Sequence, residues 1–111
     1  MKYLLLICTE GQFDPADHAP AELDARPWVE EMAGRGVRLT GSRVRAASDA
    51  TTVRVRGGER LVTDGPFAET KEQMGGFDIV ECADLDEAIE VAAKHPMAAL
   101  GMVEVRPFWT D

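Results

Sequence analysis

The sequence contains few of the residues that bind metals or form cross-links. Its 111 residues include two cysteines, Cys8 and Cys82, and two histidines, His18 and His95. Both cysteines lie in apolar runs, which favours small buried thiols over a disulfide or a metal pair. The two histidines are far apart in the chain and lack the spacing of zinc ligands. The sequence therefore predicts no metal site.

Long apolar runs are also absent. The N-terminal run, residues 3–8, is far shorter than the roughly 18 residues that cross a membrane. No small-residue cleavage site follows it, so it does not have the form of a secretory signal. We therefore expect a cytoplasmic protein with no membrane partner.

Positive charge is scarce, because twelve basic residues stand against twenty acidic ones and give a net charge of −8. A nucleic-acid backbone is bound by a basic stripe, which this balance argues against. Most of the arginines fall between residues 35 and 60, at alternating strand positions. They fit a solvated sheet edge or internal ion pairs, with an anion-binding surface as the alternative. We expect no nucleic-acid partner.

Motifs for phosphate binding and for nucleophilic catalysis are missing. Gly57 and Gly58 form a turn, while Gly75 and Gly76 precede a strand instead of following one. No serine lies in a nucleophile elbow. An enzyme built from this chain would therefore use carboxylates, lysine and histidine in acid–base chemistry, and we expect no cofactor.

Alternation of apolar and polar residues indicates strands and helices in a regular order. Strands are predicted at residues 2–8, 37–45, 77–82 and 102–108, and helices at 25–35 and from Asp84 to about His95. Two further strands, 52–56 and 59–63, form a hairpin around Gly57-Gly58 that pairs Arg56 with Glu59 and Val53 with Val62. The order β-α-β, hairpin, β-α-β predicts one α+β domain, residues 1–111, with the ferredoxin-like split arrangement.

Apolar stripes and capping residues define the two helices. Asp24 is the predicted N-cap of the first helix, and Asp84 that of the second with Glu87 as its capping-box partner. The predicted buried stripes are Trp28, Val29, Met32 and Ala33 in the first helix and Leu85, Ala88, Ile89 and Ala92 in the second. His95, before Pro96, is predicted to be a simple helix-end residue.

The first strand is apolar on both faces, with Tyr3, Leu5 and Ile7 on one and Leu4, Leu6 and Cys8 on the other. Such a strand is central in its sheet and covered on each side. Two helices cover one face of a ferredoxin-like antiparallel sheet, and the chain has no further element for the other. We therefore expect a homodimer that packs sheet to sheet.

Residues 64–76 concentrate the candidate chemistry. They contain four candidate catalytic residues, Asp64, Glu69, Lys71 and Glu72, in which neighbouring carboxylates and an ammonium group would separate an acid from a base. Candidate ligand-binding residues are Phe67, which would exclude water, Tyr3 and His18. The alternative is that Asp64 is a turn acceptor and that Glu69, Lys71 and Glu72 form a solvated loop face. Thr70 and Gln73 fit a capping box around a single helical turn.

The run Asp-Gly-Pro-Phe-Ala-Glu-Thr-Lys-Glu-Gln at residues 64–73, with Gly75, Gly76 and Phe77 after it, resembles the signature of the DGPF-domain, YCII-related family. The N-terminal Met-Lys-Tyr, the Thr-Thr-Val-Arg-Val-Arg strand at 51–56, residues 84–88 and residues 103–107 are similar to it in the same order. The resemblance covers essentially the whole chain.

The resemblance implies a dimeric α+β barrel, in which two ferredoxin-like protomers join through their sheets and enclose a cavity near the inserted loop. It also implies a link to enzymes of the wider superfamily that use a His-Asp pair, and to alternative sigma factors and stress responses. Those enzymes carry a histidine in the first helix, where this chain reads Asp-Ala-Arg-Pro-Trp at 24–28.

Three functions are consistent with the sequence. The first is a homodimeric barrel that binds a small molecule, or acts on it as a lyase or isomerase, at the 64–76 segment. The second is a non-catalytic partner in a transcription or stress circuit linked to a sigma factor. The third is a structural assembly module. A pocket with titratable groups and apolar walls would favour the first.

Overall fold

The computed structural model describes residues 1–11, 13–65 and 72–110. Its main sheet has four antiparallel strands in the order β2-β5-β1-β6, which is the ferredoxin-like order, so the predicted fold class is confirmed. The strands are β1 (Lys2–Glu10), β2 (Arg38–Arg43), β5 (Glu72–Glu81) and β6 (Met102–Pro107), and a separate pair is β3 (Thr51–Arg56) and β4 (Glu59–Asp64). The helices are α1 (Pro20–Leu23), α2 (Arg26–Gly34), α3 (Leu85–Ala93) and α4 (Pro96–Leu100), with 3-10 turns η1 (Pro15–Asp17) and η2 (Ala47–Asp49).

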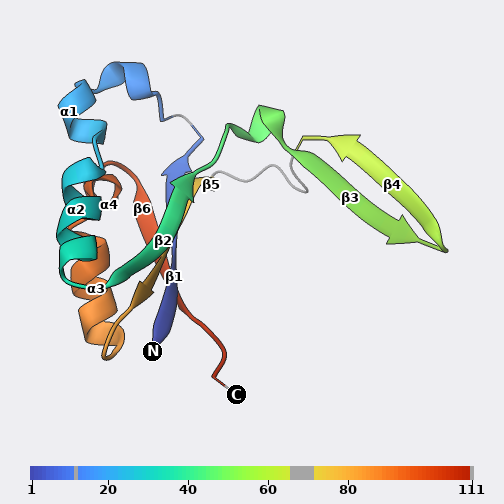
Figure 1. Cartoon of the computed structure of the whole chain (residues 1–111). Coiled ribbons are helices and arrows are strands. Elements are labelled where there is room, and N and C mark those ends of the chain that lie inside the picture. The colour runs from blue at the N-terminus through green and yellow to red at the C-terminus, as the bar shows by residue number, and fades with distance from the viewer. Residues whose placement is uncertain (12, 66–71, 111) are drawn as a thin grey trace.

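Strand β1 is central, as its sequence predicts. It pairs with β5 on one side and β6 on the other, and α2, α3 and α4 lie on one side of the main sheet (Figure 1). Tyr3, Leu5 and Ile7 face the helices and are buried. Leu4 and Leu6 point to the opposite face, where the single chain leaves them only half-buried. Helices therefore cover one face of the sheet, and the single chain leaves the other face open.

The core is formed between α2, α3 and the helix side of the sheet. Its largest fully buried side chains are Leu5, Met32, Val80 and Val91. Trp28 is a core anchor, as predicted, and its indole Nε1 donates to the backbone oxygen of Val91 at 2.9 Å.

Part of the predicted helix stripes is wrong, because Ala33, Leu85 and Ile89 are exposed. The buried face of α3 is centred instead on Ala88, Val91 and Ala92. The two small alanines allow α3 to lie close to the sheet, which moves Leu85 and Ile89 to the edge of the contact. Cys82 is buried beside α3, and burial raises the pKa of its thiol to about 11.

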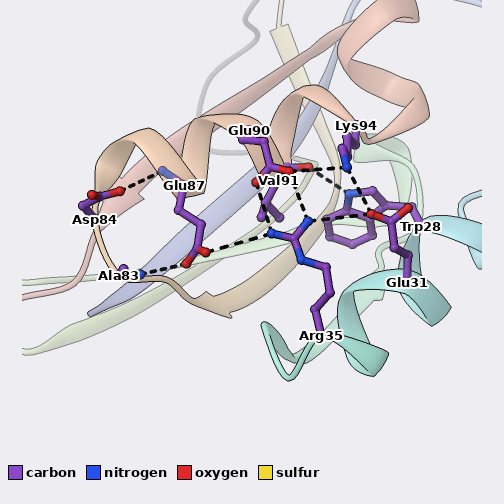
Figure 2. A network of polar contacts seen from close by, with 9 residues as sticks. All are labelled: Trp28, Glu31, Arg35, Ala83, Asp84, Glu87, Glu90, Val91 and Lys94. Carbon is purple, nitrogen blue, oxygen red and sulfur yellow. Dashed lines mark hydrogen bonds and ion pairs between the residues drawn. The ribbon is translucent and has the colours of Figure 1, made fainter.

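An ion-pair network joins α2 to α3 (Figure 2). The Arg35 guanidinium donates two hydrogen bonds of 3.1 Å to the carboxylate of Glu90. It also lies 3.7 Å from Glu31, and Lys94 bridges Glu31 and Glu90 at 3.3 Å to each. Such exposed pairs add little stability.

Helix ends follow the predicted caps with small differences. Asp84 caps α3 by accepting from the Glu87 amide at 2.9 Å, as predicted. Helix α2 begins at Arg26, one residue later than expected, and its N-cap is Ala25. Asp24 still accepts from the Arg26 amide at 3.0 Å. No helix within residues 1–11, 13–65 and 72–110 has the length and apolar character needed to cross a membrane.

Strand β5 begins at Glu72, five residues earlier than predicted, so the capping box that Gln73 was expected to complete is wrong. Gln73 pairs with Thr9 across the sheet. Gly75 and Gly76, which were expected to precede this strand, lie inside it, and the backbone of β2 approaches Gly76 closely. A Cβ on Gly76 would lie 3.0 Å from the backbone oxygen of Ser42.

The β3–β4 hairpin has the predicted register, with Arg56 opposite Glu59 and Val53 opposite Val62. Positive φ angles of 59° and 78° at Gly57 and Gly58 match a two-residue hairpin turn. The hairpin projects as an arm from the rest of the molecule (Figure 1). The radius of gyration, 15.9 Å, accordingly exceeds the roughly 13 Å of a compact chain of this length.

Candidate functional site

A cavity of about 410 Å³ lies on the helix side of the main sheet. Its volume falls in the range of small-molecule pockets. Its walls come from β1, β2 and β5 below and from the 13–15 segment, α1, α2 and α4 above. The apolar lining includes Ile7, Phe13, Leu23, Val29 and Met97.

The polar end of the cavity contains a buried ion pair. Arg38, at the start of β2, donates from Nε to Oδ1 of Asp78 in β5 at 2.8 Å. The side chain of Asp78 is 8% exposed and that of Arg38 is 19% exposed. Asp78 points inward from a central strand, and burial raises the pKa of its carboxyl even though Arg38 acts to lower it. A buried carboxylate with a raised pKa is a candidate general base.

Gly41 leaves the space that the Arg38–Asp78 ion pair occupies. It lies opposite Asp78 in the β2–β5 ladder, just after a register shift between Arg38 and Thr40. A Cβ at this position would overlap Oδ1 of Asp78 and lie 2.8 Å from a terminal nitrogen of Arg38. Only glycine therefore allows the two side chains to meet over the β2 backbone.

His95 lines the same cavity from the start of α4. Its Nδ1 accepts from the amide of Met97 at 3.0 Å, so the proton of the neutral ring is on Nε2. The imidazole packs edge-on against Trp28, with ring centroids 4.8 Å apart. Burial lowers its pKa to about 4, which keeps His95 neutral at pH 7. A neutral imidazole can donate a hydrogen bond without carrying charge.

The three polar residues offer different chemistry in one cavity with largely apolar walls. Asp78 can accept a proton, neutral His95 can donate a hydrogen bond, and Arg38 can stabilise negative charge. The lining of the cavity thus contains groups suited to acid–base chemistry. No group of three or more His, Cys, Asp and Glu side chains that could hold a metal occurs among the residues described.

The predicted site residues that the structure describes do not meet at this cavity. Asp64 is exposed at the end of β4. Tyr3 is 4% exposed in the core, opposite Val80 and away from the Ile7 end of β1 that lines the cavity. His18 stacks on Phe13 and lies 3.7 Å from Glu22. His18 is therefore behind a lining residue, not in the lining itself.

The other predicted site residues cannot be placed in the same way. Phe67, Glu69 and Lys71 lie outside the described residues. Glu72 begins β5 opposite Glu10, and only its backbone is described. Their roles remain predictions. The strand that follows them reaches the cavity at Gly75.

Sequence reasoning missed Arg38, Asp78 and His95. One signal was present for Asp78, which occupies an inward position in the otherwise apolar run at 77–80. A carboxylate at such a position needs a buried partner. No local signal identifies Arg38 as that partner, because the pairing depends on the β2–β5 register. His95 was predicted to be a simple helix-end residue, because its burial against Trp28 depends on a tertiary contact that the sequence does not show.

Comparison with known proteins agrees with the fold. The model of the YCII-related domain family matches residues 1–110. An uncharacterised protein of Rhizobium meliloti (strain 1021) is 52% identical over 60 residues, which cover 52% of this chain and 48% of that protein. The match therefore spans about half the length of this relative. With almost every residue matched by the family model, the chain belongs to the YCII-related domain family.

Proposed function

We propose that this protein is a cytoplasmic homodimer that binds a small molecule in the cavity and acts on it by cofactor-free acid–base chemistry. The observation that carries the proposal is the buried Asp78 carboxylate, paired with Arg38 and accompanied by neutral His95 inside apolar walls. Perturbed titratable groups gathered in a cleft are typical of catalytic sites.

The reaction class that fits is a lyase or isomerase reaction. The Asp78 carboxylate would remove a proton from a carbon next to a carbonyl group. The electron pair would move onto the carbonyl oxygen, where Nε2–H of His95 and the Arg38 guanidinium can stabilise the negative charge. Return of the proton to another carbon completes an isomerisation, and loss of a leaving group completes an elimination.

Binding is tested first, by a thermal-shift screen of purified protein against small metabolites. A ligand at 100 times its dissociation constant stabilises the folded state by about 2.7 kcal/mol, which is readily measured. A hit then provides the substrate series for turnover assays. A screen without any hit would argue for the alternative, a non-catalytic partner linked to a sigma factor, which rests on the family resemblance alone.

Replacing Asp78 by asparagine distinguishes the cavity from the 64–76 segment. The Asp78→Asn protein is expected to lose about 10²- to 10⁴-fold in turnover, because the amide cannot accept the proton. The matched variant is Asp64→Asn, which makes the same change at an exposed site. If Asp64→Asn lost activity and Asp78→Asn did not, the chemistry would belong to the 64–76 segment.

The dimer proposal is supported by two apolar surfaces on one chain. One is the open face of the main sheet, with Leu4 and Leu6. The other is one face of the β3–β4 arm, where Val53, Val55 and Val62 are each more than half exposed. An isolated two-stranded hairpin is marginally stable in water, so the arm needs a surface to pack on.

Charge favours a second copy as the partner. Residues 51–64 carry three arginines against Glu59 and Asp64, a net charge of +1, so the other residues carry −9. A weakly basic arm is thus attracted to the acidic body of another copy. We propose that the sheets pack through their open faces and that each arm lies on the partner.

Exchange of the arm's three exposed valines for threonine tests this assembly. The triple variant Val53→Thr, Val55→Thr and Val62→Thr keeps β-branched side chains but places hydroxyls on the apolar face. We expect its dimer dissociation constant to rise at least tenfold in analytical ultracentrifugation, while Leu61→Thr on the arm's other face has a smaller effect. A wild-type protein that is monomeric at micromolar concentration would contradict the dimer itself.

A further inference from the structure

We infer that the ligand of the cavity is a small monocarboxylic acid with an apolar body, bound with its carboxylate at the arginine end. The inference rests on the proposed small-molecule function and specifies its ligand class. It follows from the charges, the unused hydrogen-bond donors and the apolar walls of the cavity.

The charged side chains that line the cavity have a net charge of +1. Arg38 and Arg43 are cations, Asp78 is the one anion among the described lining residues, and His95 is neutral at pH 7. This excess of one positive charge occurs in a chain whose net charge is −8. A cationic ligand would be repelled there, because the single carboxylate is already engaged by Arg38. A monoanion balances the site.

Several hydrogen-bond donors of the lining are not used by any residue that the structure describes. Arg38 uses Nε for Asp78, and its two terminal nitrogens make no hydrogen bond to any residue the structure describes. Arg43 lines the cavity from the end of β2, is exposed to solvent, and forms no ion pair with any residue in the described ranges. Nε2–H of His95 adds a further donor. A guanidinium presents paired N–H groups that match the two oxygens of a carboxylate.

The apolar walls of the cavity indicate the chemistry of the rest of the ligand. Ile7, Val29 and Met97 provide no hydrogen-bonding side-chain group other than the weakly accepting sulfur of Met97. A second charge on the ligand would be desolvated there without a partner, which is strongly unfavourable. Dicarboxylates and phosphate dianions are therefore poor fits. An aliphatic or aromatic body of up to about ten carbons, with one carboxylate, matches both ends of the cavity.

Binding of three compounds with a common skeleton tests the ligand class. The probes are 3-phenylpropionate, 3-phenylpropionamide and 3-phenylpropylamine, with hexanoate as an aliphatic acid, measured by calorimetry and thermal shift on the full chain. We expect saturable binding of the acids, at least tenfold weaker binding of the amide and no binding of the amine. Acid binding should weaken about tenfold in Arg43→Gln, while amide binding is unchanged.

The matched control is Arg45→Gln. Arg45 lies two residues after Arg43, is exposed and pairs with Asp49, so this variant removes the same charge outside the cavity lining. Unchanged acid binding in this variant supports a local contact. An equal loss in both variants would show a general charge effect and overturn the inference. Tighter binding of the amide or amine than of the acid would overturn the ligand class but leave the proposed function intact. If no compound of this series or of the metabolite screen binds, the proposed function itself fails.

Discussion

A Gly41→Ala substitution is expected to destabilise the protein by about 3 to 5 kcal/mol, the usual cost of breaking a buried ion pair. The added methyl group would overlap Oδ1 of Asp78 and lie 2.6 Å from the backbone oxygen of Phe77. Because the Phe77 oxygen belongs to β5, which is paired with a strand on each side, it cannot move aside cheaply. Asp78 must therefore move away from Arg38 and leave a buried charge without its partner. Urea unfolding of the two proteins measures the difference.

Gly34→Ala provides the matched control for this substitution. Gly34 is the last residue of α2, its φ is negative, and nothing lies within 4 Å of a Cβ built on it. Alanine should stabilise the protein there by up to about 1 kcal/mol, because it reduces the freedom of the unfolded chain. Wild-type stability in Gly41→Ala would contradict the close packing of Gly41 against the ion pair.

Acidification from pH 6.5 to about 4 is expected to remove up to about 3 kcal/mol of stability through His95 alone. The folded state holds this imidazole neutral and lowers its pKa from 6.5 to about 4. Above pH 6.5 the ring is neutral in both states, and its contribution is complete. As the pH falls, the unfolded chain binds the proton first, and the folded state is progressively disfavoured.

Comparison with His95→Asn isolates this contribution. Asparagine can still cap α4 but cannot titrate, so the free energy of unfolding of the His95→Asn protein should depend less on pH. Asp78 has a raised pKa and acts with the opposite sign, since its contribution is present at low pH and is lost as the pH rises. Both proteins retain Asp78, so its effect cancels in the difference. The free energies of unfolding of the wild-type and His95→Asn proteins are measured with urea from pH 4 to 7.5. If the two depend on pH in the same way, the folded state does not protect His95 from protonation.

The 64–76 segment shows which features of this protein local sequence patterns predict and which they do not. The sequence correctly predicted a hairpin before it and a strand after it, because glycine turns and alternating side chains are local signals. It did not predict that β5 begins at Glu72, because that depends on partners that are distant in the chain. Gly75 and Gly76 are typical of a turn when considered alone, yet both lie inside β5, and at Gly76 the backbone of β2 approaches closely.

The sequence by itself determined the order of strands and helices along the chain, the hairpin register, the apolar first strand and the family, since each depends on short-range periodicity or a contiguous motif. The tertiary structure alone decided that Arg38, Asp78 and His95 share a cavity. Those residues come from β2, β5 and α4, separated by 40 residues in the case of the ion pair. The shifted pKa values of Asp78 and His95 arise from burial, and the Arg38–Asp78 pairing arises from strand register. Both exist only after distant segments have packed together.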